Sequence, residues 1–349
     1  MAGKADDRRL YGMLLHLGYN MWCDRRKLRD LNEKRRYPIP DDITGERRKK
    51  LEYEYTHNCY SPVLTFDDDV FWRVAEKMAK AGMNFILIDV GDGYAYPSRP
   101  EIAVKGAWSP EKMRTALARL RSMGLEPIPK LNFSATHDAW MGEYSRMTST
   151  KPYYDVVADC IADLCEVFNP RLFHIGYDEE DDWHQAAFDH VVIRQGDLWW
   201  HDFLFTVREV EKRGVRAWAW SDRIWQHKAE FLKKWPKSVL CSNWYYLPEF
   251  EYPKDHEFYP MVKAYEWLEE AGYDQMPCCS TCGGWRLPTG NPVLTAKHVM
   301  PRIAPERLKG LLSAPWARTI PIFEDWLDAC VEQTAPAIEM LRGGLAPAS

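Results

Sequence analysis

The segment Met83–Val90 reads MNFILIDV and carries the clearest signal of the fold. It is a run of apolar and β-branched residues of the length of one strand. An amphipathic stretch at Asp68–Ala81 precedes it, and a second one, Pro110–Met123, follows after Ser109. Serine at an N-cap with proline at the first helical position is a common helix start. The segment is therefore predicted to be a buried strand between two helices.

The same alternation of short apolar runs and longer amphipathic stretches extends outward in both directions. Strands are expected at Leu10–Leu17, Met83–Val90, Leu125–Leu131, Arg171–Tyr177, Val215–Trp220, Ser238–Ser242, Gln275–Cys279 and Leu308–Ser313. Helices are expected at Asp68–Ala81, Pro110–Met123, Tyr154–Phe168, Leu198–Arg213, Ile224–Lys234, Met261–Ala271, Ala296–Ile303 and Pro321–Leu341. Such an order predicts an α/β fold, a single (β/α)8 TIM barrel over residues 1–349. A doubly wound open sheet competes, but the glycine-rich phosphate motifs of that fold are absent from the sequence.

One long stretch without a regular pattern, Cys23–Thr65, separates the first strand from its helix. Loops of such length are usually functional or disordered. In a barrel this stretch would lie on the face that carries active sites. Residues 23–65 are therefore predicted to be an inserted loop near the active site, and their Tyr and Arg content suits a lid or a subunit contact.

Composition narrows the classes of partner. The 349 residues include 46 Lys+Arg and 51 Asp+Glu, a net charge of −5, which argues against nucleic acid because phosphate binding needs a basic face. No apolar run approaches the length of about 18 residues that a membrane span needs. The polar N-terminus lacks the apolar core of a signal peptide, so we expect a cytoplasmic protein, or a secreted or periplasmic one whose leader was trimmed. No cofactor or metal motif is found, and the oligomeric state is left open.

The active site of a barrel enzyme lies at the C-terminal ends of its strands. Two kinds of side chain gather at the expected strand ends, carboxylates after the fourth strand and tryptophans around several others. The tryptophans are Trp22, Trp140, Trp218, Trp220, Trp244, Trp285 and Trp316. Flat indole rings stack on the apolar faces of sugars, and carboxylates supply acid–base chemistry. The sequence therefore predicts a carbohydrate-binding site.

The acids Asp178, Glu179, Glu180 and Asp181 open a run of five that follows the strand-like segment Leu172–Tyr177 (LFHIGY). On pattern alone such a run is more often a solvated loop. Neighbouring residues on a strand point to opposite faces, but where the strand gives way to a loop both Asp178 and Glu179 can face the site. Carboxylates packed together raise one another's pKa, which suits a proton donor near neutral pH.

These residues also carry a family resemblance. Phe173–Glu179 (FHIGYDE) resembles the H-x-G-G-D-E signature of glycoside hydrolase family 20, the β-N-acetylhexosaminidases, with Tyr177 in place of one glycine. Pro129–His137 resembles the P-E-I-D-x-P-G-H segment of that family. Trp218–Asp222 resembles its W-x-D region, and Ser242–Tyr245 its S-x-W-Y segment. The resemblance covers most of the barrel at low identity.

The resemblance implies retaining, exo-acting hydrolysis of a β-glycoside in which the 2-acetamido group of the sugar attacks its own anomeric carbon. Glu179 would be the general acid/base, and Asp178 would orient the acetamido group and stabilise the oxazolinium. Tyr245 would hydrogen-bond the acetamido oxygen, and His137 would hold Glu179. The further residues implied to line the sugar site are Trp220, Asp222, Trp244, Trp285, Trp316, Tyr19, Asn20 and Arg318.

Three positions depart from the family pattern. Tyr19 stands where the family has an arginine that grips sugar hydroxyls, Arg318 replaces the glutamate of W-x-E, and Asn132 replaces an aspartate. The groups that recognise the far edge of the sugar therefore differ. We expect a substrate other than plain N-acetylglucosamine, and Arg318 favours an acidic or sulfated sugar.

Two other functions are compatible with the same residues. One is a metal-dependent sugar isomerase or epimerase, for which mixed histidine and carboxylate ligands are available. Its candidate ligands are His137, Asp138, Asp178, Glu179 and Asp222. The other is a non-catalytic carbohydrate-binding barrel that uses only the aromatic residues.

Overall fold

The parallel sheet predicted from the sequence is present as a barrel. The computed structural model describes residues 9–22, 39, 41–57, 60–182, 184–185, 188–281 and 290–344. Its strands are β1 Leu10–His16, β2 Phe85–Asp89, β3 Glu126–Lys130, β4 Leu172–His174, β5 Arg216–Trp220, β6 Leu240–Ser242, β7 Cys278–Cys279 and β8 Gly310–Ser313. They pair in the order β6-β5-β4-β3-β2-β1-β8-β7, and every pairing is parallel. This order confirms the (β/α)8 prediction.

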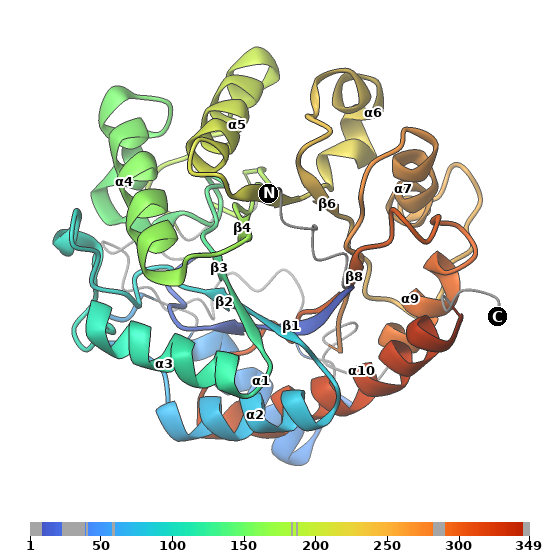
Figure 1. The fold of residues 1–349 in the computed structure, drawn as a ribbon, viewed down its shortest axis with the longest axis horizontal. Coiled ribbons are helices and arrows are strands. Elements are labelled where there is room, and N and C mark those ends of the chain that lie inside the picture. Colours follow the sequence, from blue (N-terminus) through green and yellow to red (C-terminus); the bar gives the residue numbers. More distant parts are fainter. Residues whose placement is uncertain are drawn as a thin grey trace, which may run out of the picture.

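Helices surround the sheet and alternate with the strands along the chain (Figure 1). They are α2 Asp68–Lys80, α3 Pro110–Ser122, α4 Lys151–Phe168, α5 Gly196–Glu211, α6 Arg223–Lys234, α7 Tyr259–Glu270, α9 Asn291–Val299 and α10 Glu324–Gly344. The short 3-10 helices are η2 Pro100–Ile102, η3 Ala139–Met147 and η4 Pro321–Phe323. The predicted start of α3 is confirmed, because Ser109 Oγ accepts a hydrogen bond of 3.1 Å from the Lys112 amide. In the part of the chain that the structure describes, no helix combines the length and apolar character needed to cross a bilayer.

The ring closes between β6 and β7 through isolated contacts rather than a full ladder. Single parallel bridges join Cys241 to Gln275 and Trp244 to Cys278. The Cys278 amide also donates a hydrogen bond of 2.9 Å to the Asn243 carbonyl. Every strand thus has a neighbour on both sides, as a closed barrel requires.

Alternate residues along the strands separate two apolar layers, as the two-residue period of a strand dictates. One layer fills the barrel interior with Leu10, Leu14, Phe85, Leu87, Ile128, Leu172, Trp218, Trp220, Leu240, Met276, Cys278, Leu312 and Ala314. The other layer, which includes Met13 and Ile86, packs between the sheet and the helices. Side chains of the inner layer that lie beyond the strand ends therefore meet over the C-terminal face.

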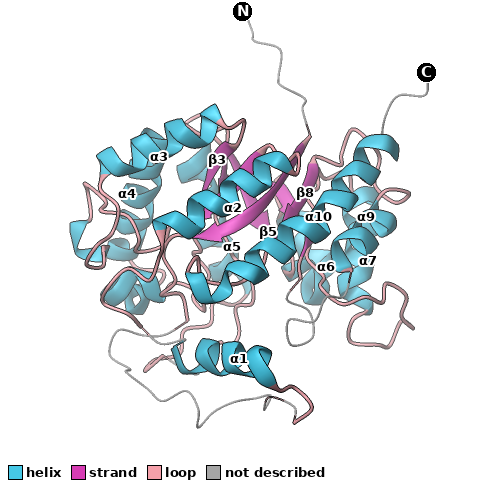
Figure 2. Cartoon of the chain, turned by 90° about the horizontal axis from the view of Figure 1, so that it is seen from below, coloured by secondary structure: helices cyan, strands magenta, loops and turns pink. Residues whose placement is uncertain are grey.

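The inserted stretch 23–65 contains one regular element among its described residues, the helix α1 Gly45–His57. Figure 2 shows it outside the ring of helices, against one end of the barrel. Leu51 of α1 packs with Ile39, Ile43 and Trp326, and the Lys50 ammonium lies 2.5 Å from the Asp325 carboxylate. The sequence predicts an irregular loop here, whereas the structure has a helix. The segment GERRKKLEYEYTH has few apolar residues, and the residues it contacts at the start of α10 are distant in the chain, so the helix leaves no local pattern.

Candidate active site

The backbone turns sharply where β4 ends. Gly176, Tyr177 and Glu179 have left-handed φ values of 74°, 75° and 50°. A Cβ at residue 176 would lie 2.0 Å from Asn132 Oδ1, so only glycine fits there. Left-handed backbone at non-glycine residues is strained and clusters at functional sites. The turn ends β4 at His174, earlier than the predicted Tyr177, and sends the four acids in different directions.

Asp178 points into the protein. Only 5% of the residue is exposed, and its Oδ1 accepts a hydrogen bond of 2.7 Å from Asn132 Nδ2. Asn132 Oδ1 in turn accepts from the Tyr177 amide at 3.2 Å, so the asparagine fixes both the carboxylate and the turn. Burial raises the pKa of Asp178, and the charge of Lys130 and the Asn132 hydrogen bond offset only part of that rise.

A second carboxyl group, Asp222, reaches the same place from the end of β5. Its Oδ2 accepts a hydrogen bond of 3.1 Å from the Glu179 amide. Burial, followed by the nearby charge of Asp178, raises the pKa of Asp222 well above its usual range. Burial and the neighbouring carboxylate therefore both favour the protonated form of Asp222.

Glu179 is more accessible and faces two histidines. Its side chain is 31% exposed, and its Oε2 lies 3.0 Å from His184 Nε2 and 3.6 Å from His137 Nε2. Burial lowers the pKa of His137 to about 3, so this ring is neutral, and its Nδ1 shares a hydrogen bond of 2.8 Å with Thr136 Oγ1. Sequence reasoning found His137 but missed His184.

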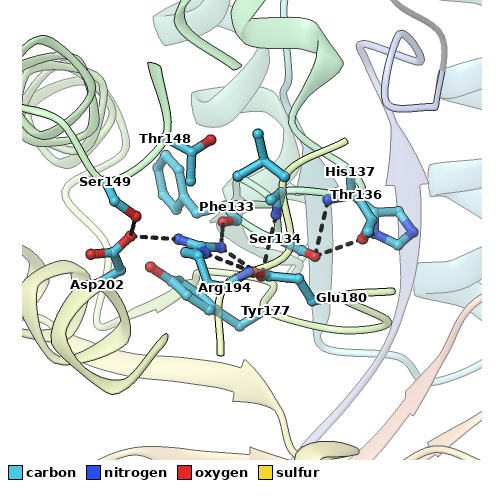
Figure 3. Close-up of polar contacts among 12 residues, drawn as sticks. Phe133, Ser134, Thr136, His137, Thr148, Ser149, Tyr177, Glu180, Arg194 and Asp202 are labelled. Carbon is cyan, nitrogen blue, oxygen red and sulfur yellow. Dashed lines mark hydrogen bonds and ion pairs between the residues drawn. The ribbon is translucent and has the colours of Figure 1, made fainter. Parts of the chain in front are cut away.

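Glu180 lies behind the site in a buried ionic network (Figure 3). Its side chain is 3% exposed, and its Oε2 lies 2.7 Å from Arg194 Nη2. Arg194 Nη1 also lies 3.1 Å from Asp202 Oδ2, and Asp202 accepts further hydrogen bonds of 2.6 Å from Ser149 and Tyr154. Hydrogen bonds satisfy the buried charges, so this network ties the loop to α5 through Asp202 and to the segment after β3 through the Phe133 carbonyl.

A charged layer lies beneath Asp178 inside the barrel. Lys130 has no exposed surface, and its Nζ lies 2.5 Å from Asp89 Oδ2. His16 Nδ1 lies 3.3 Å from the same oxygen. Burial alone would raise the pKa of Asp89, but the charge of Lys130 and the contacts with His16 outweigh it and lower the pKa to about 2. The layer therefore holds charge in a fixed arrangement under the site.

Aromatic rings continue the inner layer above these charges. The Trp220 and Trp316 rings lie 5.9 Å apart, and Trp244 stacks on Tyr246 at 5.2 Å. Trp244, Tyr246 and Trp316 are partly buried against the interior cluster. Tyr245, between two of them in sequence, faces the other way. Its hydroxyl is 2.6 Å from that of Tyr252, and its ring lies 5.1 Å from that of Phe250.

Comparison with known proteins adds a structural likeness to this geometry. No family model matches the chain, and none of the curated proteins matches it. The barrel resembles glycoside hydrolase family 20 β-N-acetylhexosaminidases. A GH20 exo-β-N-acetylglucosaminidase from Vibrio harveyi superposes with a TM-score of 0.57 at 13% identity, over 97% of this chain and 57% of that one.

Two other solved structures show the same likeness. The GH20 β-N-acetylhexosaminidase from Streptomyces coelicolor A3(2) gives a TM-score of 0.56 at 15% identity, over 79% of this chain and 61% of that one. The β-N-acetylhexosaminidase from Bacteroides fragilis gives a TM-score of 0.56 at 11% identity, over 93% of this chain and 65% of that one. The present chain thus spans 57% to 65% of the lengths of these neighbours. At such identities the likeness is one of fold.

Other predicted site residues take different places. Trp218 is fully buried in the barrel. Trp140 is also buried, and its Nε1 donates a hydrogen bond of 3.0 Å to the Asn132 carbonyl. Both are core residues rather than walls of an open site. Trp22 is partly exposed, with its ring 5.8 Å from that of His137. Trp285 lies outside the described residues.

The residues at the edge of the site are bound to one another. Arg318 Cζ lies 4.6 Å from the centre of the Tyr19 ring, and the Tyr19 hydroxyl donates a hydrogen bond of 3.3 Å to the Trp316 carbonyl. Asn20 Nδ2 donates hydrogen bonds of 2.7 Å to Asp92 and 2.8 Å to the Ser61 carbonyl. Asn20 therefore joins loops, whereas Arg318 and Trp316 lie beside the aromatic group that includes Trp220.

One group of side chains in the described part of the chain has the spacing of metal ligands. Ligand atoms of His137, Asp178 and Glu179 all lie within 4.8 Å of one another. A histidine with two carboxylates suits several divalent ions. However, Asn132 and His184 already contact the two carboxylates, and a charged imidazole beside Glu179 repels a cation. The arrangement therefore favours proton transfer over metal binding.

Proposed function

We propose that this chain is a retaining, exo-acting β-glycosidase that hydrolyses a 2-acetamido sugar with assistance from the acetamido group. The pair Asp178 and Glu179 carries the proposal. Asp178 is buried and oriented by Asn132, whereas the next residue, Glu179, is accessible and contacts two histidines. A fixed acceptor beside an accessible acid/base is what this reaction needs.

In the first step, the acetamido oxygen attacks the anomeric carbon and the bond to the glycosidic oxygen breaks. Glu179, as a carboxylic acid, gives its proton to that oxygen, and the alcohol departs. Asp178 accepts a hydrogen bond from the acetamido N–H and stabilises the positive charge of the oxazolinium. The buried position of Asp178 strengthens this interaction, because it lies in a medium of low dielectric constant.

In the second step, water attacks the anomeric carbon and the Glu179 carboxylate takes one of its protons. The bond between the acetamido oxygen and the anomeric carbon breaks, and the sugar leaves with its original configuration. Each attack occurs on the face opposite to the departing group, so two inversions give retention. Glu179 ends the cycle as a carboxylic acid, ready for the next substrate.

The aromatic residues supply the wall for the sugar. Trp244 and Trp316 are partly buried against the barrel interior and would face the sugar, whereas Trp220 is 1% exposed and packs behind Trp316. Tyr246, which shares this side with Trp244, replaces Tyr245 as the tyrosine that would donate to the acetamido oxygen. Arg318 beside Trp316 favours a sugar that carries an anionic group. Support for an acetamido sugar also comes from the Vibrio harveyi neighbour, whose structure contains N-acetylglucosamine.

A panel of aryl β-glycosides tests the proposal. The sugars differ at C2 (acetamido or hydroxyl) and at C6 (hydroxyl, carboxylate or sulfate). We expect turnover only of acetamido sugars, a preference for an anionic substituent, and inhibition by a thiazoline that mimics the oxazolinium. Equal turnover of the 2-hydroxy sugars without thiazoline inhibition would refute substrate assistance.

The metal-ligand spacing of His137, Asp178 and Glu179 supports a second candidate, a metal-dependent sugar isomerase or epimerase. Incubation with a chelator separates the two functions. Activity that disappears with the chelator and returns with Mn²⁺ or Zn²⁺ supports the isomerase. Sugar binding without turnover of any glycoside supports a non-catalytic barrel.

A further inference from the structure

Trp316 follows β8 with a strained backbone. Its φ is 49°, in the left-handed region that favours glycine and is costly for a residue with a large side chain. A conformation of this kind persists only where the surrounding structure holds it. The indole ring lies among the inner aromatic residues, 5.9 Å from His16 and 5.9 Å from Trp220. Neighbouring contacts must therefore hold Trp316 where it walls the site.

Tyr19, in the loop after β1, makes such a contact. Its hydroxyl donates a hydrogen bond of 3.3 Å to the Trp316 carbonyl, which is 297 residues away along the chain. The phenol ring is itself restrained, because Arg318 Cζ lies 4.6 Å from its centre and the His16 ring lies 4.8 Å from it. A ring that is held on two sides thus presents its hydroxyl to the Trp316 carbonyl.

The backbone on either side of Trp316 is anchored to neighbouring strands. Before it, the Ala314 amide donates a hydrogen bond of 2.9 Å to the Cys279 carbonyl. After it, a parallel bridge joins Arg318 to His16. The tyrosine hydroxyl therefore contacts the short stretch between these two anchors, where the left-handed residue lies.

The surroundings of Tyr19 leave little of it for direct contact with a sugar. The residue is 8% exposed, and its hydroxyl already donates to the Trp316 carbonyl. A further ring, that of Trp22, lies 5.2 Å from the phenol ring. These contacts favour a role for Tyr19 through Trp316, in place of the sugar contact that the sequence resemblance implies for this position.

We propose that Tyr19 is a positioning residue that holds Trp316 in its left-handed conformation and so fixes the indole wall of the sugar site. The inference rests on the proposed function, in which Trp316 faces the sugar. A wall that stacks on the sugar binds the substrate and the transition state alike, so its misplacement raises KM and leaves kcat nearly unchanged. This pattern separates Tyr19 from the carboxylates, whose loss lowers kcat.

The first test compares two tyrosine hydroxyls that donate to tryptophan carbonyls. Tyr19→Phe keeps the ring and removes the hydrogen bond to Trp316. For the best aryl glycoside, KM should rise about two- to tenfold, the range expected for one hydrogen bond, and kcat should stay within about twofold. An unchanged KM in a folded Tyr19→Phe protein overturns the proposal.

Tyr273→Phe is the matched control for this test. The Tyr273 hydroxyl donates a hydrogen bond of 3.0 Å to the Trp235 carbonyl where α6 ends, and Trp235 has an ordinary φ of −69°. This variant also loses one hydroxyl that donates to a tryptophan carbonyl, but no strained wall depends on it. It should leave KM and kcat unchanged, and a rise in KM equal to that of Tyr19→Phe overturns the proposal.

A double-mutant cycle shows whether Tyr19 acts through Trp316. Trp316→Gly removes the indole, and glycine adopts a left-handed φ without strain, so the backbone is retained. In that background Tyr19→Phe should have no further effect on KM, because there is no indole left to place. The same rise in KM in both backgrounds overturns the proposal, because it indicates that the tyrosine hydroxyl contacts the sugar directly.

The last test needs no turnover. The full chain is labelled with fluorotryptophan, and Trp316→Phe assigns the ¹⁹F signal of Trp316. We expect Tyr19→Phe to shift or broaden this signal, because the strained backbone is released while a phenyl ring remains at residue 19, and Tyr273→Phe to leave it in place. A Trp316 signal that is the same in Tyr19→Phe and wild-type protein overturns the proposal. If the wild-type protein turns over no glycoside, the proposed function fails, and the NMR measurement still decides the role of Tyr19.

Discussion

Glu179 and Glu180 are neighbours with the same side chain, yet they have opposite surroundings. Glu179 is 31% exposed and faces two histidines, whereas Glu180 is 3% exposed and binds Arg194. An arginine keeps its proton at any ordinary pH, so Glu180 contacts a permanent cation. Glu179 instead contacts one neutral and one charged imidazole, because burial lowers the pKa of His137 to about 3 and hydrogen bonds raise the pKa of His184 to about 10, and its exposed surface is open to a substrate. The partner, rather than the acid itself, separates a reactive group from a structural one.

The largest expected effect comes from removing the carboxyl group of Glu179. Glu179→Gln should lower kcat/KM for an aryl glycoside by about 10²- to 10⁴-fold, the usual contribution of a general acid/base. The thermal midpoint should change little. Glu166→Gln on α4, where the side chain is 80% exposed, is the matched control and should retain full activity. Unimpaired turnover by Glu179→Gln would remove this residue from the reaction.

The next largest effect comes from removing Arg194, the cation that binds Glu180. Arg194→Met leaves the Glu180 and Asp202 carboxylates buried without their cation, which should lower the free energy of unfolding by about 3 to 5 kcal/mol in urea titrations. Lys151→Ala removes an exposed ion pair with Asp155 and should cost at most about 0.5 kcal/mol. Equal losses in the two variants would contradict the buried network.

A smaller effect concerns the carboxyl group shared by the site. The raised pKa of Asp222 means that the folded protein holds a proton that the unfolded chain releases, so wild-type stability falls as pH rises above the unfolded value. Asp222→Asn has no such proton. We expect the stability of Asp222→Asn relative to the wild-type protein to increase as pH rises from 4 to 7, measured by urea titrations at both pH values. A gap that does not vary with pH excludes this explanation.

The smallest effect sharpens the role of the histidine partner. Because the pKa of His184 is raised to about 10, its stabilisation is complete below pH 6.5 and disappears as pH rises toward 10. The difference in unfolding free energy between wild type and His184→Gln should therefore shrink by about 1 to 2 kcal/mol from pH 6 to pH 10, since the ring is partly exposed. Urea titrations at both pH values measure this difference. A difference that stays constant contradicts an ion pair between His184 and Glu179.

The sequence is sufficient to predict the barrel, and it places Asp178 and Glu179 directly after the fourth strand. Apolar runs as long as Met83–Val90 are local signals, and the C-terminal ends of parallel strands meet at one face. Strand β4 is shorter than predicted because the positive φ values of Gly176 and Tyr177 depend on the packing of Asn132. Local pattern does not contain that contact.

The sequence pattern could not predict which side chains contact the acids. His184 and Arg194 lie in an irregular loop, and their contacts depend on how that loop folds back over the β3 end. The orientation of Tyr245 had a usable signal. Trp244 and Tyr245 are adjacent where β6 ends, and adjacent strand residues face opposite sides, so this rule places the two rings on different sides of the strand. The same rule places Tyr246 on the side of Trp244.

The thin closure between β6 and β7 has a consequence for motion. Two isolated bridges join these strands, whereas β1 and β2 pair through five residues each. Fewer backbone hydrogen bonds mean a lower free energy of local opening. Trp244 forms one of the bridges and Tyr246 lies two residues beyond it, so the wall that carries them is held by fewer ladder pairs than the β1–β2 side. The barrel is thus stiff beneath the carboxylates and compliant beside them.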